Sequence, residues 1–155
     1  YAAFEWYCLS HLNNLKVVPK LFAQLGIPPL PDKYAAALLA PQKGQAWLQR
    51  TNNSRFVVSL SERGVCTVKA PDVDGKATQI LFEMHTRNKK LDSEKVGSQQ
   101  QDAYAVTFPD PSGNKDGHAL IILSISNLRS VQGIILNALP EKFLNAEGLT
   151  PPQWP

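Results

Sequence analysis

The stretch that decides the fold is residues 55–70, which read RFVVSLSERGVCTVKA. Two runs of alternating apolar residues lie on either side of a Glu-Arg-Gly turn: Phe56, Val58 and Leu60, then Cys66, Val68 and Ala70. Successive side chains of a strand point to opposite faces. The stretch therefore predicts a β-hairpin with one apolar face.

The residues before this hairpin predict a third strand and a set of helices. A β-rich run at 46–51 precedes an Asn-Asn-Ser turn, so the three runs form a meander. An amphipathic helix is expected over residues 2–15, because its apolar positions recur at steps of three and four: Phe4, Cys8, Leu12 and Leu15. Shorter helices are expected over 19–25 and over 32–40, the second with Asp32 as its N-cap.

The residues after the hairpin predict one more helix and further strands. Following a turn at 72–75, a helix carries its apolar side chains on one face: Ala77, Ile80, Leu81 and Met84. Residues 91–99 are typical of a polar edge strand, and runs at 104–108 and 119–125 form a hairpin around a Pro-, Asp- and Gly-rich loop. Residues 128–139 fit a helix, which we favour, but Gly133-Ile134-Ile135-Leu136 fits a strand equally well.

The sequence as a whole predicts an α+β protein. We expect N-terminal helices packed on a mostly antiparallel sheet, in the order α-α-α-β-β-β-α-β-β-β-(α). Residues 1–140 are expected to form a single domain, and residues 141–155 an extended C-terminal tail.

Composition and charge exclude several classes of protein. The chain has 155 residues, of which 43% are hydrophobic and 19% charged, with a net charge of +3. A chain of this length builds one core, and its apolar stretches are far shorter than the roughly 20 residues of a membrane span. The small excess of Lys and Arg does not indicate a nucleic-acid partner. The sequence opens at Tyr1, so a targeting peptide or a lipid anchor upstream of that residue is left open.

The two cysteines, Cys8 and Cys66, are both expected on inward faces, one on a helix and one on the sheet. This arrangement favours a disulfide between them, with two buried thiols as the alternative. A disulfide indicates an oxidising compartment, so we expect a periplasmic or extracellular protein.

Three features resemble a group of uncharacterised small envelope proteins of proteobacteria, some of them periplasmic or lipoprotein-like. These features are the early helical Cys8, Trp47 at the start of the first strand, and the Gly64-Val65-Cys66-Thr67-Val68 segment. The resemblance covers residues 4–125. It implies export and a Cys8–Cys66 disulfide, and it brings no catalytic residue with it.

The sequence predicts no catalytic residue, no metal site and no cofactor. It holds no Gly-x-Ser-x-Gly, His-Glu-x-x-His, Walker or Gly-x-Gly-x-x-Gly pattern. The histidines His11, His85 and His118 are far apart, and acidic stretches beginning at residues 72 and 110 lack the glycine of a calcium loop. An envelope hydrolase is the alternative function, built from Ser59 or Ser61 with His85 and Asp72.

The sequence therefore favours a non-enzymatic domain that binds another protein, such as an inhibitor, an immunity protein or a secretion-system accessory. Residues 43–90 hold nine cations and four acids, so we expect an acidic partner. The candidate contact residues are Arg50, Arg55, Arg63 and Lys69. The other candidate is Trp154 in the tail, whose ring is either an anchor for a partner, a packing anchor within the chain, or exposed.

Overall fold

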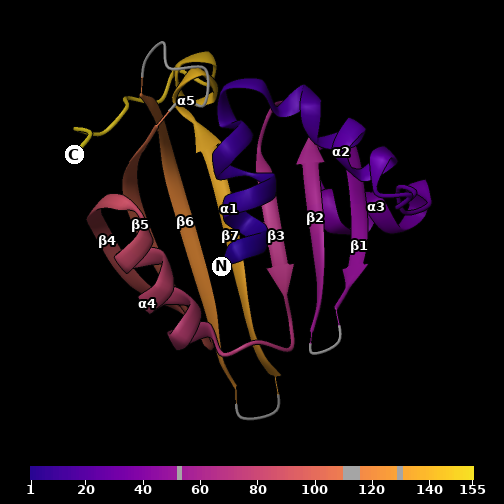
Figure 1. The fold of residues 1–155 in the computed structure, drawn as a ribbon. Helices are drawn as coiled ribbons and strands as arrows, with labels where there is room; N and C mark the ends of the chain where they lie inside the picture. Colours follow the sequence, from indigo (N-terminus) through magenta and orange to yellow (C-terminus); the bar gives the residue numbers. More distant parts are fainter. Residues whose placement is uncertain (52–53, 110–115, 129–130) are drawn as a thin grey trace.

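A computed structural model describes residues 1–51, 54–109, 116–128 and 131–155. A seven-stranded sheet runs through the molecule with strand order β1-β2-β3-β7-β6-β5-β4, and neighbouring strands are antiparallel (Figure 1). The strands are β1 (Gly44–Arg50), β2 (Arg55–Ser61), β3 (Cys66–Ala70), β4 (Arg87–Val96), β5 (Gln99–Phe108), β6 (Gly117–Leu128) and β7 (Val131–Pro140). The expected α+β class, with helices first and a meander next, is confirmed.

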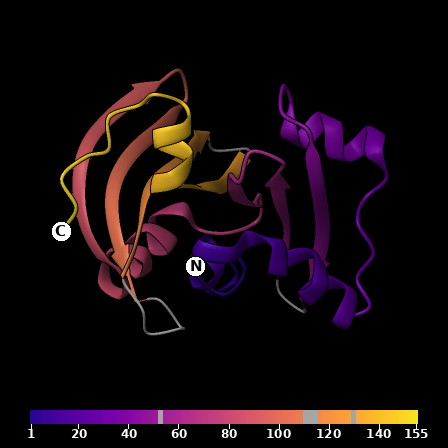
Figure 2. The ribbon, with the colours of Figure 1, turned by 90° about the horizontal axis from the view of Figure 1, so that it is seen from above.

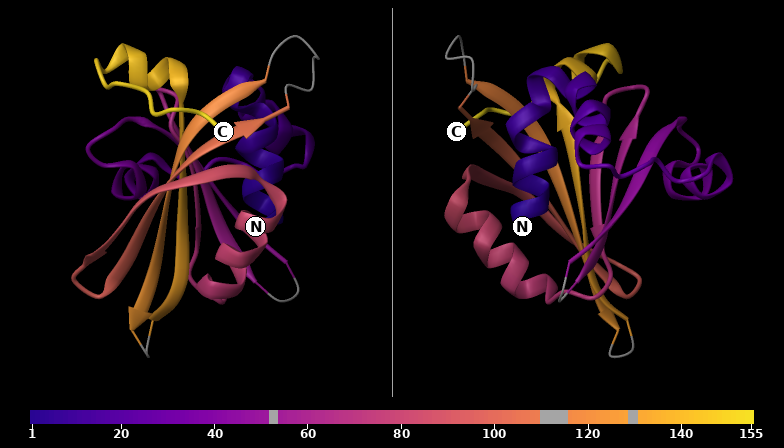
Figure 3. Two further views of the ribbon diagram at one scale, coloured as in Figure 1. Left: turned by 90° about the vertical axis from the view of Figure 1, so that its left-hand side faces the viewer. Right: turned by 45° about the vertical axis from the view of Figure 1, so that its right-hand side comes forward.

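Helices lie on both faces of the sheet (Figures 2 and 3). The face that we call the front carries α1 (Ala2–Tyr7), the 3-10 helix η1 (Leu9–Val17), α2 (Val18–Gln24) and α4 (Gly75–His85). The back face carries α3 (Asp32–Leu39) on β1 and β2, and α5 (Glu141–Ala146) on β6 and β7. Between α3 and α5, no helix of the described residues lies over the middle of the back face (Figure 2).

The core lies between the front helices and the sheet. Aromatic rings fill its centre, where Phe22 of α2 stacks between Tyr7 and Trp47 with ring centroids 4.5 Å and 4.7 Å apart. The strand residues expected to point inward are buried, Val58, Val68, Tyr104 and Val106 among them, and Leu60 is partly buried. The alternation in residues 55–70 therefore predicts the front face correctly.

The expected disulfide is present. Cys8, at the junction of α1 and η1, is bonded to Cys66 on β3, and their Cα atoms are 5.6 Å apart. Both residues are fully buried. The bond joins the N-terminal helices to the middle of the sheet across 58 positions of sequence.

The single helix expected over residues 2–15 is wrong in its second half. The α-helix ends at Tyr7, and η1 follows as a 3-10 helix that departs from helical geometry at Asn14 (φ −145°, ψ 65°). Ser10 and Asn14 are weak helix formers whose side chains compete for backbone hydrogen bonds. The apolar side chains still face the core after the α-helix ends, because Leu12 and Leu15 are buried.

The helix favoured over residues 128–139 is wrong. Residues 131–140 form β7, which pairs with β3 on one side and β6 on the other. At Gly133 a Cβ atom would collide with the backbone of Pro71, so glycine allows this close approach. The strand is needed because β3 and β6 would otherwise both present an unpaired edge.

Three further expectations need correction. The tail expected to be extended over 141–155 begins with α5, whose Phe143 and Leu144 are buried. The edge strand β4 begins at Arg87, four residues before the expected start, because the sheet pairs it with β5 from Thr107 onward. The N-cap of α3 is Pro31, and Asp32 lies in its first turn. The acidic loop at 110–115 and the Asn52-Asn53 turn lie outside the described residues.

Candidate functional site

The outer face of α4 is apolar and exposed to solvent. Its side chains at steps of three and four point to solvent: Ile80 is 56% exposed, Leu81 44% and Met84 74%, and Ala77 is exposed beside them. We call these four residues the α4 stripe. Asp74 caps the helix by accepting a hydrogen bond from the Ala77 amide at 3.0 Å, so the stripe lies on a well-defined element.

An amphipathic surface helix ordinarily turns its apolar face to the core. In α4 the inward residues are instead Gly75, Thr78 and Phe82, with Gln79 and Glu83 beside them. Phe82 packs edge-on against Tyr104 of β5, with ring centroids 5.0 Å apart. The inward face therefore holds one large apolar side chain, and the larger apolar set faces water.

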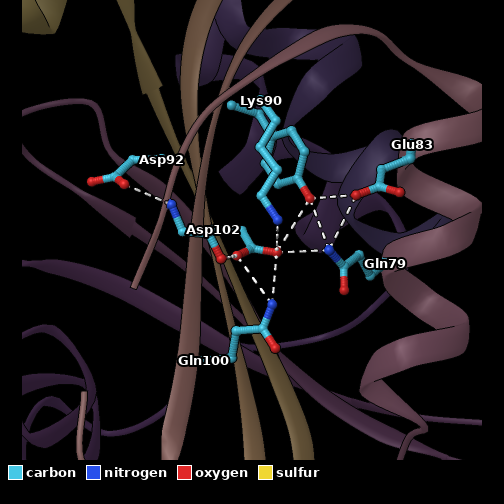
Figure 4. A network of polar contacts seen from close by, with 8 residues as sticks. Gln79, Glu83, Lys90, Asp92, Gln100 and Asp102 are labelled. Carbon is cyan, nitrogen blue, oxygen red and sulfur yellow. Dashed lines mark hydrogen bonds and ion pairs between the residues drawn. The ribbon is translucent and has the colours of Figure 1, made fainter. Parts of the chain in front are cut away.

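Polar contacts with β4 and β5 explain this orientation. Figure 4 shows them gathered around Asp102, whose side chain is fully buried. Gln79 of α4 donates to Asp102 Oδ2 at 2.7 Å, and Glu83 of α4 accepts a 2.5 Å hydrogen bond from the Tyr104 hydroxyl. Lys90 forms an ion pair with Asp102 Oδ2 at 2.8 Å. We call the participants the Asp102 network: Gln79, Glu83, Lys90, Ser93, Gln100, Asp102 and Tyr104.

The charge on Asp102 is stabilised by its neighbours. Burial by itself would raise the pKa of this carboxyl group, but hydrogen bonds from Lys90, Ser93 and Gln100 lower it below its ordinary value of 3.8. Burial, together with the hydrogen bond to Glu83, raises the pKa of the Tyr104 phenol, which therefore stays a hydrogen-bond donor at neutral pH. The Asp102 network thus consists of an ionised carboxylate surrounded by donors.

The Asp102 network fixes which side of α4 faces the sheet. Rotating the helix to bury the stripe would remove Gln79 and Glu83 from their partners and leave Asp102 and Tyr104 with unmade hydrogen bonds, at about 1–3 kcal/mol each. Fully burying an exposed large apolar side chain contributes about 1.5–3 kcal/mol, but the three stripe side chains are already partly buried, and the rotation would also take Phe82 out of the core. The present orientation forgoes part of that gain for three side chains, which marks the stripe as a surface available to another molecule.

Comparisons with protein-family models, with curated proteins and with solved structures found no match.

Three of the four candidate cations, Arg50, Arg55 and Lys69, lie by register on the back face of β1, β2 and β3, and Arg63 lies apart from them. Arg50 and Arg55 face each other at one end of the β1–β2 pair, and Arg55 forms an ion pair with Asp72 at 2.6 Å. Arg63 lies at the other end of β2, where it pairs with Glu147 and lies over the Phe143 ring. Lys69 is exposed on the back face of β3. That these residues contact a partner stays a prediction, and two of the four already have a carboxylate neighbour.

Trp154 packs within the chain. Its ring stacks on His118 with centroids 5.2 Å apart, and its Nε1 donates to Glu141 Oε1 at 3.2 Å. The structure therefore shows the packing role, in which the ring holds the end of the tail against β6; contact of Trp154 with a partner stays a prediction.

The residues of the alternative hydrolase are not brought together. Ser59 and Ser61 lie on the back face, His85 ends α4 on the front, and Asp72 pairs with Arg55. His85 does line a cavity of about 390 Å³ together with Asp116 and Thr107. In that cavity the His85 ring stacks on Tyr1, Asp116 pairs with Arg87, and Thr107 donates to the Pro155 carbonyl oxygen.

Within the described ranges, no group of three or more His, Cys, Asp or Glu side chains is placed to hold a metal ion. Among those same residues, no helix is long and apolar enough to cross a membrane.

Sequence reasoning identified the helix and the four residues of its stripe but not their direction. The signal that could have indicated it lies on other elements: Asp102 alternates with Tyr104 and Val106 on the inward face of β5. A charged residue at an inward strand position needs polar partners on whatever packs over it. In α4 only the Gln79 and Glu83 side offers them.

Proposed function

We propose that this protein is a non-enzymatic protein-binding domain that presents the α4 stripe to a partner protein. The observation that carries the proposal is the orientation of α4, with Ile80, Leu81 and Met84 in solvent and the polar side against the sheet. The spacing at 77, 80, 81 and 84 is that of helices that insert one face into an apolar groove.

The partner is a different protein rather than a second copy. An 11-residue helix is about 16 Å long and about 10 Å wide, so two α4 helices packed face to face cover about 160 Å². A stable interface needs roughly 800 Å² on each partner. A groove on a different protein can enclose the helix on three sides and so buries more of it than a second α4 helix does.

Charge favours an acidic rim on the partner's groove. Lys76, in the first turn of α4, is exposed and belongs to no ion pair in the described part of the chain. Lys90, beside the helix, is 40% exposed at its side chain even though it pairs with Asp102. Carboxylates on the rim would meet both ammonium groups, mainly speeding encounter and fixing orientation.

The disulfide supports a location outside the reducing cytosol, in the periplasm or the extracellular medium. An inhibitor, an immunity protein or a secretion-system accessory meets its partner in such a compartment, and each acts through surface complementarity without a catalytic motif. These are the kinds of protein that the proposal covers.

A photo-crosslinking amino acid at residue 84, introduced into the full chain in the cells that make it, tests the proposal. The matched control carries the same amino acid at Leu25, an exposed apolar residue of comparable setting at the end of α2. We expect a discrete protein adduct from position 84 and none from position 25.

The adduct partner is then purified and its affinity measured. Ile80 and Leu25 are each 56% exposed, so Ile80→Gln and Leu25→Gln make a matched pair. We expect Ile80→Gln to weaken binding about tenfold, because it removes a buried apolar contact, and Leu25→Gln to leave it within about twofold. Equal adducts from both positions, or affinity unchanged by Ile80→Gln, would refute the proposal.

A further inference from the structure

The back face holds a polar groove of about 400 Å³ between α3 and the strands β2, β3, β7, β6 and β5. We call it the back-face groove. Its volume falls within the roughly 300–1,000 Å³ of small-ligand sites, whose linings are mostly apolar. This one differs, because hydroxyl, amide and ammonium groups form its floor: Ser59, Thr67, Lys69, Gln101, Ser124 and Asn137.

Strand pairing arranges these groups in two rows. Ser59 pairs with Thr67, which pairs with Asn137, so three polar side chains from neighbouring strands lie side by side. In the next row Lys69 lies between Val57 and Ile135, followed by Ser124 and Gln101. Paired residues of adjacent strands share a face, so both rows open into the groove.

Some hydrogen-bond donors on the floor of the groove remain available to a ligand. The Thr67 hydroxyl donates to Asn137 Oδ1 at 2.7 Å, which leaves the two Nδ2 hydrogens of Asn137 for another acceptor. Lys69 takes part in none of the ion pairs within the described residues. The described residues that line the groove include no Asp or Glu. A ligand that fits must bring acceptors and a negative charge.

Only side chains can recognise such a ligand. The floor strands β2, β3, β7 and β6 are each paired on both sides, so their backbone amides and carbonyls are already used in the sheet. A peptide that relies on backbone pairing finds no free strand edge there. A saccharide, whose hydroxyl groups both donate and accept, matches a floor of hydroxyls and amides. One lysine suits a single carboxylate better than a phosphate, which proteins usually hold with several donors or cations.

We propose that the back-face groove binds a carboxylated oligosaccharide. Its carboxylate pairs with the Lys69 ammonium, and its hydroxyl groups bond to Asn137, Gln101 and the hydroxyls of Ser59 and Ser124. Val57 and Ile135, on either side of Lys69, contact the carbon faces of the sugar rings. The groove and the α4 stripe lie on opposite faces of the sheet, so this proposal does not depend on the protein-binding function.

The test is an NMR titration of the full, isotopically labelled chain, in which the side-chain amide signals of Asn137 and Gln101 report on the groove. The probes are a trisaccharide of galacturonic acid, the neutral galactose trisaccharide, and triglutamate. We expect saturable shifts with the acidic trisaccharide. Binding of the other two probes should be at least about tenfold weaker, because the neutral trisaccharide lacks the charge and triglutamate lacks the hydroxyl groups.

Two variants assign the contact. Lys69 and Lys89 are both exposed, and by register both lie on the back face, but Lys89 is on the edge strand β4 outside the groove. Lys69→Gln is expected to weaken binding at least about tenfold and Lys89→Gln to leave it within about twofold. Both substitutions replace exposed residues, and the retained dispersion of the amide spectrum verifies folding.

Several outcomes overturn the proposal. One is the absence of saturable shifts at millimolar acidic trisaccharide. Others are equal binding of the neutral trisaccharide, equal binding of triglutamate, which would mark an anion or peptide site, and affinity that Lys69→Gln leaves unchanged.

Discussion

Two helical segments lie on the same front face of the sheet with opposite sides inward. The α1–η1 segment buries its apolar stripe, including Phe4, Cys8 and Leu12, whereas α4 exposes its own stripe and buries its polar side. The first segment is held by apolar contacts and one covalent bond, the second by the Asp102 network and Phe82. Amphipathic spacing therefore locates a helix and its two sides, while the strands beneath decide which side faces inward.

The largest expected effect tests the covalent attachment of the first segment. Replacing both cysteines, Cys8→Ala with Cys66→Ala, should lower the free energy of unfolding by about 4 kcal/mol, because the bond closes a loop of 58 positions in the unfolded chain. Denaturant titration measures the change, and intact mass with and without reductant verifies the bond in the parent protein. A loss below about 1 kcal/mol would show that apolar packing alone holds the segment.

The next effect breaks the attachment of α4. Asp102→Asn removes the charge that Lys90, Ser93 and Gln100 surround, and should destabilise the protein by about 2–3 kcal/mol, since Lys90 keeps partial access to water. Asp92→Asn is the matched control: Asp92 lies on β4 and accepts a hydrogen bond only from its neighbouring Ser93 amide among the described contacts. Equal effects from the two variants would mean that the Asp102 network does not hold α4.

Acid should weaken the attachment of α4 more than that of α1. The pKa of Asp102 is lowered on folding, so its contribution to stability is complete above the unfolded value of 3.8 and is lost as the pH falls through the lower folded value. The stability difference between the parent protein and Asp102→Asn should therefore be constant above about pH 5 and shrink below 3.8. Denaturant titrations of both proteins from pH 7 to pH 3 measure this stability difference. A difference that grows on acidification would contradict the prediction.

The last comparison makes the same Leu→Ala substitution on both segments, and the smallest effect of all is expected at Leu81. Leu12→Ala in η1 should cost about 2–5 kcal/mol, because Leu12 is buried in the core. Leu81→Ala in α4 should cost no more than about 1 kcal/mol, because that side chain is half exposed. Thermal unfolding of the two variants provides the comparison, and similar costs would show that the α4 stripe is packed in solution.

Local pattern was enough to predict the meander, the Cys8–Cys66 bond and the helix at 75–85. Each depends on alternation or spacing within a few residues, as with Val58 and Cys66, whose inward directions follow from strand parity. The strand β7 could not be predicted in this way. Ile135 and Leu139 fit a helical period as well as a strand, and the choice depends on β3 and β6, which lie far away in sequence.

The candidate site was harder to predict than the fold for the same reason. The direction of the α4 stripe depends on Asp102, which lies 18 residues beyond Met84, and the back-face groove depends on strands from both halves of the chain. The six residues of α5 are too few to show a helical period. Surface contacts between distant segments leave no local pattern in the sequence.

The pairing of β3 with β7 sets an order of events as the chain is made. Cys66 pairs with Ala138, so the second neighbour of β3 is formed by residues more than seventy positions further along the chain. Until then a nascent chain has an open, apolar strand edge, the kind of surface that aggregates or recruits chaperones. In an oxidising compartment the Cys8–Cys66 bond needs only the first 66 residues, so it can hold the N-terminal helices against β3 before β7 is in place. A chain truncated just before β7 would therefore display two partly built sheets, open to chaperone binding along both β3 and β6.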